Sequence, residues 1–399
     1  MNITVFDIDS IGKDIDISPI TSLGNTKVFP CTNACELADR IKDTEVAVLN
    51  KIKLTEAVLK NAPNLKLICV AATGFDNIDT KYCRENGIAV ANVPGYSTHS
   101  VAAVTVATVL DLLTHLKEYS DFVTSGSYTA SGAPNRLSPV FHDLYGKTWG
   151  IIGYGNIGKK VADVARAFGC KVIYNKNTPV NDPDCVDIDT LCKNSDIITI
   201  HCPLNDSTRH LINREKFGLM KKDVIIVNSA RGLVWDEEEA ANAVFEQRIG
   251  GLGCDVYSAE PFPADHPFDK IKDKANVCLT PHIAWASFEA RTKVVCEMAH
   301  NIQVKSLRCH FLASAFLLRY ILPPRIDAGS HRNAAMQQHR MELHLHPWRK
   351  HITSVISIIK ETLRIQGRHG FTNSRKILGT YQHINIRHSP QSGGRIVML

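Results

Sequence analysis

The stretch Thr148-Trp-Gly-Ile-Ile-Gly153-Tyr-Gly155-Asn-Ile-Gly158 passes from an apolar run into a turn with three spaced glycines. An amphipathic segment, 156–168, follows the turn, and a second apolar run, 171–174, comes after it. Between a strand and a helix, such glycines allow a tight bend and let the backbone approach a pyrophosphate at the positive end of the helix. The glycine pattern alone is common in turns, but in this context it predicts a dinucleotide-binding βαβ unit at Gly153, Gly155 and Gly158.

The position that selects between NAD and NADP departs from the usual pattern. An acidic residue at the end of the second strand commonly binds the adenosine ribose. Here Asn175 and Lys176 follow the run 171–174. An aspartate would repel the 2′-phosphate of NADP, whereas an amide does not. We therefore expect NAD as the cofactor, with NADP permitted.

Short apolar runs alternate with helix-like segments along most of the chain. Predicted helices lie at 35–42 and 55–61, the second with Thr55 as its N-cap, and a long apolar helix is expected at 100–119. A loop rich in Ser, Gly and Pro follows at 124–139. The alternation predicts an α/β fold with doubly wound parallel sheets. The other predicted strands are 3–6, 47–49, 67–70, 88–92, 197–201, 224–228, 253–255 and 277–279.

The composition excludes several classes of protein. Hydrophobic residues make up 44% and charged residues 22% of the 399 residues, as in globular proteins of two or three domains. The chain has no run of about 18 apolar residues, so we expect no membrane-spanning helix. Residues 1–9 do not resemble a signal peptide. The 12 cysteines form no Cys-x-x-Cys pair, although Cys31 and Cys35 are closely spaced. We expect reduced cysteines, no bound metal, no membrane partner and a cytoplasmic protein.

The charge is unevenly distributed. The chain has 46 Lys and Arg against 40 Asp and Glu, a net charge of +6. From Lys305 onward, 15 Lys and Arg stand against three acidic residues, so this segment carries +12 and the first 304 residues carry −6. The acidic body has no electrostatic reason to bind nucleic acid, and none is expected as a partner of residues 1–303.

Three charged side chains follow predicted strands of the second series. They are Arg231 in the segment 228–232, Glu260 in 255–261 and His282 in 281–287. Strand ends of this kind face the cofactor crevice of an open α/β sheet. Arginine can bind a carboxylate with two hydrogen bonds, histidine can donate a proton to a carbonyl oxygen, and glutamate can orient and favour the protonated imidazole. Together these groups suit the reduction of a 2-keto acid.

Each of the three also has a simpler interpretation. An arginine after a strand is often a surface ion-pair partner, Pro-His is common in loops, and Glu-Pro is common in turns. The catalytic interpretation therefore depends on the order and the spacing of the three motifs.

At these motifs the sequence resembles the D-isomer-specific 2-hydroxyacid dehydrogenase family. The resemblance extends from about Lys66 to Asn301, with a matching layout before it. It rests on the glycine turn and on the segments 72–77, 201–204 with Thr208, 228–232, 255–261 and 281–287.

The resemblance implies roles for individual residues. Arg231 would bind the substrate and act in catalysis, Glu260 would be the partner of His282, and His282 would be the acid and base. The backbone at Thr73 and Gly74 would bind the substrate carboxylate, and Lys51 would also contact the substrate. The residues implied to line the cofactor are Thr105, Gly153, Gly155, Asn156, Ile157, Gly158, Asn175, Cys202, Pro203, Ser229, Ala230, Asp255, near the carboxamide, and Trp285.

The resemblance also implies the domain organisation. A Rossmann domain that binds NAD(P), 99–286, would be inserted into a flavodoxin-like substrate domain formed by 1–98 and completed by about 287–303. The helix 100–119 would join the domains and form the contact of a homodimer.

Within the family, Leu49-Asn50-Lys51 and His282-Ile-Ala-Trp-Ala look most like the glycerate dehydrogenase (hydroxypyruvate reductase) branch. This implies hydroxypyruvate and D-glycerate as substrate and product. Phosphoglycerate dehydrogenases look less similar, because only Lys51 and Lys53 offer positive charge in this region. The alternatives are a dehydrogenase of another 2-hydroxy acid, such as D-lactate or 3-phosphoglycerate, and a corepressor-like protein that senses a dinucleotide. Turnover of a 2-keto acid distinguishes a dehydrogenase from a protein that only senses the dinucleotide.

The α/β pattern stops near residue 303. The segment 304–399 is an unclassified, Arg-rich and His-rich tail. It is interpreted as a disordered or frameshifted extension, as a basic appendage for nucleic acid or acidic membranes, or as a metal-binding His tract around 343–346. The abrupt change in composition favours the first interpretation.

Overall fold

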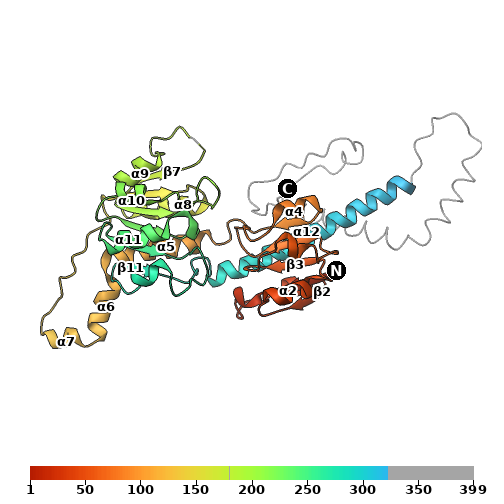
Figure 1. Ribbon diagram of the computed structural model, residues 1–399, viewed down its shortest axis with the longest axis horizontal. Helices are drawn as coiled ribbons and strands as arrows, with labels where there is room; N and C mark the ends of the chain where they lie inside the picture. Colours follow the sequence, from red (N-terminus) through yellow and green to blue (C-terminus); the bar gives the residue numbers. More distant parts are fainter. Residues whose placement is uncertain (179, 322–399) are drawn as a thin grey trace, which may run out of the picture. The chain divides into compact units, whose positions relative to one another are not determined.

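The computed structural model describes residues 1–178 and 180–321, so most of the predicted tail lies outside the described residues. Two parallel β-sheets, each with helices on both faces, make up the described chain (Figure 1). Both belong to one unit, Met1–Leu307. This confirms the predicted α/β class with two doubly wound parallel sheets.

The first sheet has five parallel strands in the order β2-β1-β3-β4-β5, which is the flavodoxin-like order. The strands β3 and β4 are buried at every residue, as expected for a sheet that is covered on both faces. The edge strand β2 was not predicted, because its residues are mostly exposed and polar. The strands are β1 (Asn2–Val5), β2 (Asn25–Val28), β3 (Val46–Leu49), β4 (Leu67–Val70) and β5 (Ala89–Ala91).

Helices from both ends of the described chain cover this sheet. One face packs against α2 (Ala34–Ile41), α3 (Glu56–Leu59) and α4 (Thr80–Glu85). The other face packs against residues that flank η1 (Ile8–Ser10), against α1 (Ser18–Thr21) and against the start of α12 (Phe288–Ile321). Val294, Val295 and Met298 of α12 are fully buried in this second layer. A segment that follows the second sheet therefore completes the core of the first.

The second sheet has six parallel strands in the order β11-β10-β9-β8-β6-β7. The order reverses at β6, which has β7 on one side and β8 on the other. In open α/β sheets, ligands bind beyond the carboxyl ends of the strands at such a reversal. The strands are β6 (Thr148–Ile152), β7 (Lys171–Asn175), β8 (Ile197–Ile200), β9 (Ile225–Asn228), β10 (Gly251–Cys254) and β11 (Val277–Leu279).

Two layers of helices cover the second sheet. One face packs against α9 (Ile188–Asn194), α10 (Arg214–Leu219) and α11 (Glu237–Phe245), with η2 (Gly232–Val234) and η3 (Pro267–Lys270). The other face packs against α5 (Thr98–Thr114) and α8 (Asn156–Ala167). Small residues such as Ala162 and Ala165 let α8 approach the sheet closely.

The single helix predicted at 100–119 is wrong. The chain forms α5 and then α6 (Leu116–Thr124), which are bent by 66°. His115 separates them in the left-handed conformation, with φ 53°. No glycine or proline lies at the break, so the sequence does not signal it. A further short helix, α7 (Ser127–Ser131), lies in the predicted loop 124–139.

The last described helix passes the position where the tail was expected to begin. α12 continues beyond residue 303 to Ile321. The other predictions for the tail, including the His tract, fall on residues outside the described ones. Within 1–178 and 180–321, no single helix is long and apolar enough to cross a membrane, although α5 and α6 meet that criterion as a bent pair.

Candidate active site

The glycine turn after β6 lies where the strand order reverses. Gly153 has φ 94°, and a Cβ at this residue would lie 2.4 Å from the backbone nitrogen of Cys202, just after β8. A side chain would therefore clash with the neighbouring strand end, besides straining the backbone. Glycine is required at position 153 because two strand ends meet there.

The turn leaves an open approach to the start of α8. A Cβ at Gly158 would lie 2.2 Å from the carbonyl oxygen of Gly153, whereas a Cβ at Gly155 would meet no atom within 4 Å. Gly155 precedes α8, and no side chain caps the first amides of this helix. An anion is favoured at an uncapped helix N-terminus. The residues at this turn, with Asn156 and Ile157, therefore fit the pyrophosphate of a dinucleotide.

Asn175 ends β7 beside this turn. Its backbone carbonyl accepts a hydrogen bond from the amide of Gly153 at 3.0 Å. Its side-chain nitrogen donates to the carbonyl of Val186 at 2.9 Å. The amide side chain is thus already engaged on one side, at the position where an acidic residue would bind a ribose.

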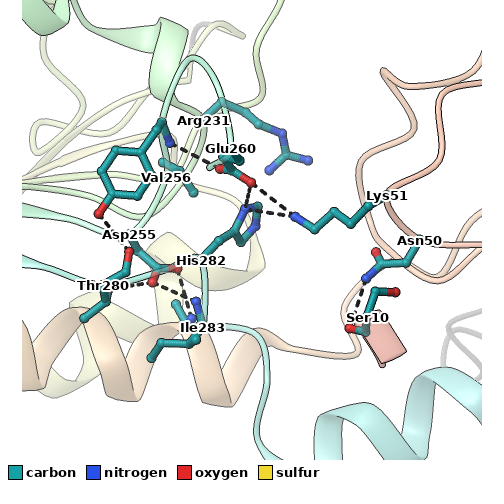
Figure 2. Close-up of polar contacts among 12 residues, drawn as sticks. Ser10, Asn50, Lys51, Arg231, Asp255, Val256, Glu260, Thr280, His282 and Ile283 are labelled. Atoms are coloured by element: carbon teal, nitrogen blue, oxygen red, sulfur yellow. Dashed lines mark hydrogen bonds and ion pairs between the residues drawn. The ribbon is translucent and has the colours of Figure 1, made fainter. Parts of the chain in front are cut away.

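His282 and Glu260 form a close pair beyond the ends of β11 and β10 (Figure 2). The imidazole Nδ1 lies 2.6 Å from a carboxylate oxygen of Glu260. The other oxygen of Glu260 accepts from the amide of Tyr257 at 3.2 Å. Burial opposes ionisation of this carboxyl, but the hydrogen bond and charge of His282, the charge of Lys51 and the Tyr257 amide outweigh it and lower the pKa of Glu260 to about 2. The carboxylate is therefore ionised at any working pH and can hold Nδ1–H, which leaves Nε2 of His282 for the substrate.

Asp255 supports the turn that carries His282. One of its carboxylate oxygens accepts from the hydroxyl of Thr280 at 2.6 Å and from the amide of Ile283 at 2.9 Å. The other accepts from the amide of Ala284 at 2.9 Å. The side chain assigned by resemblance to the cofactor is thus engaged in three hydrogen bonds to the His282 turn.

Arg231 is positioned by Asn228 and Gly74. The side chain of Asn228, which is buried, donates to the carbonyl of Arg231 at 2.9 Å and accepts from the amide of Ala230 at 3.0 Å. A Cβ at Gly74 would lie 1.8 Å from a guanidinium nitrogen of Arg231. The guanidinium also lies 3.6 Å from the carboxylate of Asp76. Arg231 therefore packs on the backbone of the segment that was predicted to bind the substrate carboxylate.

Lys51 lies against the His282–Glu260 pair (Figure 2). Its amine is 3.3 Å from a carboxylate oxygen of Glu260 and 3.1 Å from Nδ1 of His282. The amides of Asn50 and Lys51 donate to the carboxylate of Asp7, which fixes the backbone after β3. Lys51 therefore adds a positive charge directly beside the pair.

A cleft of about 730 Å³ connects these groups. His201, Asp76, Asn77 and Tyr96 also line it, and the sequence did not single them out as site residues. The lining does not include Thr105, Gly153, Gly155, Asn156, Gly158 or Asn175, which lie at the glycine turn or behind the cleft wall. The predicted residues that do line it are Lys51, Thr73, Gly74, Ile157, Cys202, Pro203, Ser229, Ala230, Arg231, Asp255, Glu260, His282 and Trp285.

A chain of polar side chains runs from the wall of the cleft to the buried Thr105. The hydroxyls of the buried Thr105 and of Ser229 lie 2.8 Å apart, and Ser229 lies 3.4 Å from Nδ1 of His201. Nε2 of His201 is buried without a protein partner, and burial lowers the pKa of His201 to about 3. His201 is therefore neutral. Its place in His-Cys-Pro directly after β8 was the only sequence signal for it.

The comparisons with known proteins agree with this arrangement. The family profile described as "D-isomer specific 2-hydroxyacid dehydrogenase, NAD binding domain" matches residues 106–284. A hydroxypyruvate reductase of Blautia hydrogenotrophica is 33% identical over 298 residues, which cover 73% of this chain and 92% of the relative. A hydroxypyruvate reductase of Thermotoga maritima is 39% identical over 271 residues, which cover 67% of this chain and 86% of the relative.

Solved structures show the same likeness. D-lactate dehydrogenase from Aquifex aeolicus, complexed with NAD and lactic acid, superposes with a TM-score of 0.68 at 30% identity and covers 76% of this chain and 94% of that one. The strand orders, the glycine turn and the paired His282 and Glu260 fit a nicotinamide dinucleotide enzyme of this kind. The chain therefore belongs to the D-isomer-specific 2-hydroxyacid dehydrogenase family and is an NAD(P)-dependent oxidoreductase of 2-hydroxy acids.

Proposed function

We propose that the enzyme interconverts hydroxypyruvate and D-glycerate with NAD as its preferred cofactor. The observation that carries this proposal is the 2.6 Å contact between His282 and Glu260 in the cleft that Arg231 also lines. A proton donor, its carboxylate partner and a carboxylate-binding cation are the groups that reduction of a 2-keto acid requires.

In the proposed mechanism, Arg231 and the backbone of Thr73 and Gly74 bind the substrate carboxylate. The nicotinamide, when bound, supplies the hydride that reaches C2 of the 2-keto acid. His282 donates a proton from Nε2 to the carbonyl oxygen, so the product is the neutral hydroxyl, and the same group takes the proton back in oxidation. Glu260 holds the imidazole through Nδ1 and favours the protonated form. Closure of the cleft over the substrate would exclude water from the path of the hydride.

The cofactor would be held by the residues assigned to it above. Gly153, Gly155 and Gly158, with Asn156 and Ile157, would bind the pyrophosphate, and Asn175 would lie at the adenosine ribose. Cys202, Pro203, Thr105, Ser229, Ala230, Asp255 and Trp285 would lie nearer the nicotinamide. The domain of residues 99–286 would thus bind the cofactor, and 1–98 with 287–303 would bind the substrate.

The choice of hydroxypyruvate is supported by the names of two relatives and by the charges of the cleft. Among the described residues that line the cleft, Lys51 and Arg231 are the Lys and Arg side chains, and both already face carboxylates. A substrate phosphate would need a further cation. An uncharged C3 hydroxyl is therefore the better match for this cleft, and Lys51 is the residue that we expect to contact it.

The test is the oxidation of NADH, followed at 340 nm, with the full chain and hydroxypyruvate. We expect turnover with a kcat/KM at least about ten times higher than with pyruvate, glyoxylate or 3-phosphohydroxypyruvate. Parallel assays with NADPH give the cofactor preference, which we expect to favour NADH. A higher kcat/KM with any of the other three acids would replace the substrate assignment, and NADH binding without any turnover would contradict the enzymatic proposal.

We also propose that the chain forms a homodimer through the predicted 100–119 region, and we extend the proposed interface to the segment 116–145. Large apolar side chains are unusually exposed here, with Leu137 at 78% and Val140 at 71%. Leu116, Phe141 and Tyr145 are exposed in the same segment. An apolar surface of this kind on an otherwise charged protein is typical of an interface.

A further inference from the structure

The loop that carries Glu260 is tied at both ends to one buried carboxylate. We call residues 257–266 the Glu260 loop. Glu237, the first residue of α11, accepts a hydrogen bond from the amide of Ser258 at 2.8 Å. Its second oxygen lies 3.0 Å from Nε2 of His266. The side chains of Glu237 and His266 are only 9% and 4% exposed, so water does not replace these contacts.

The contacts of His266 determine its protonation. Nδ1 of His266 accepts a hydrogen bond from the amide of Phe268 at 3.2 Å, so this nitrogen carries no proton. Nε2 is then the donor to Glu237. Each oxygen of Glu237 therefore accepts one hydrogen bond, from the amide of Ser258 and from Nε2 of His266. The next acid of α11, Glu238, is exposed and pairs instead with Lys270.

Aromatic rings enclose the imidazole and restrain the same loop. The ring of Phe262 stacks on His266 with centroids 4.7 Å apart, and Tyr257 meets it edge-on at 6.1 Å. Both rings belong to the Glu260 loop. On its other side, a Cβ at Gly232 would lie 2.1 Å from the carbonyl carbon of Tyr257, so the loop packs closely against the residue after Arg231.

We propose that Glu237 and His266 are positioning residues that hold Glu260 against His282. The inference rests on the proposed function, in which this pair performs the proton transfer. The amide of Tyr257 binds one oxygen of Glu260, and the neighbouring amide of Ser258 is bound by Glu237. The buried carboxylate thus fixes the peptide that orients the carboxylate at the active site. We call the contacts of Glu237 with Ser258 and His266 the Glu237 clamp. If these contacts are lost, Glu260 contacts His282 for less of the time, and the protonated imidazole is less favoured.

The test uses the full chain with Glu237→Gln and, separately, His266→Phe. The first change directs an N–H₂ group at a donor. The second keeps an aromatic ring in place and removes both ring nitrogens, Nε2 and the Nδ1 that accepts from the amide of Phe268. In both variants we expect kcat for reduction to fall by about tenfold, and the pH at which kcat/KM falls to half to move down by about one unit. NADH binding should change by less than about twofold. The matched control is Glu238→Gln, the same chemical change one residue along the same helix.

A double variant and hydrogen exchange complete the test. The double variant should resemble either single variant, because the two groups act as one unit. Amides of the Glu260 loop should exchange faster in Glu237→Gln than in Glu238→Gln, whether or not the chain reduces hydroxypyruvate. An unshifted pH profile in both single variants, even with a lower Tm, would overturn the inference and leave a purely structural role. If the unaltered chain reduces no 2-keto acid, the proposed function fails and the exchange result alone decides for or against the Glu237 clamp.

Discussion

His282 has a backbone conformation that is uncommon for residues other than glycine. Its φ of 55° lies in the left-handed region, which costs a non-glycine residue on the order of 1 kcal/mol. Asp255 offsets this cost with hydrogen bonds to residues on both sides of His282, at Thr280 and at Ile283 and Ala284. The imidazole is thus aimed by a turn that the sequence motif alone does not reveal.

Replacing His282 by Gln should remove the proton donor and leave the fold intact. We expect kcat for the reduction to fall by about 10²- to 10⁴-fold, with NADH binding within about twofold of the unaltered chain. Stopped-flow turnover and NADH fluorescence titration measure the two quantities. His210→Gln is the matched control, because His210 is an exposed histidine with a similar φ of 50°. Full activity in His282→Gln would refute the acid–base assignment.

Replacing Gly74 by Ala should displace Arg231. The new Cβ would lie 1.8 Å from a guanidinium nitrogen, so the arginine must move away from the substrate carboxylate. We expect KM for hydroxypyruvate to rise by about tenfold or more, while the dissociation constant of NADH stays the same. The control is Gly218→Ala, where a Cβ meets no atom within 4 Å. An unchanged KM would mean that Arg231 does not bind the carboxylate from this position.

At the scale of elements, the strands with continuous apolar runs and the helices at 35–42 and 156–168 were predicted within a few residues, whereas the end of the long apolar helix was not. All six strands of the second sheet were predicted within a few residues, because buried parallel strands are short, β-branched and bounded by turns. The break between α5 and α6 was missed because the left-handed residue is a histidine, whereas glycine is the usual signal at such a position.

Substitutions at residue 115 can test whether the break between α5 and α6 requires the left-handed conformation. A β-branched residue is strongly disfavoured at φ 53°, whereas asparagine tolerates this region. We expect His115→Val to lower the free energy of unfolding by about 1–2 kcal/mol and His115→Asn to change it by less than about 0.5 kcal/mol. Urea unfolding curves measure both. Equal effects of the two substitutions would show that the left-handed conformation is not required.

At the scale of the whole molecule, the exposed apolar segment 116–145 predicts a dimer. We expect the full chain to sediment with twice its monomer mass at micromolar concentration. The double substitution Leu137→Glu and Val140→Glu should produce monomers, because two charges would be buried at the interface. Phe245→Glu, an exposed apolar site on α11, is the control and should leave the mass unchanged. A monomeric unaltered chain, or a dimer that survives the double substitution, would contradict this interface.

The sequence by itself determined the fold class, the glycine turn and the strand ends that carry Arg231, Glu260 and His282. These features depend on local periodicity and on residues close together in the chain. Only the tertiary structure decided which contacts these groups make with one another across the chain. Lys51 meets Glu260 and His282 across 209 and 231 residues of sequence, and Gly74 makes room for Arg231. Such contacts depend on where the chain returns after each crossover, so no short-range pattern records them.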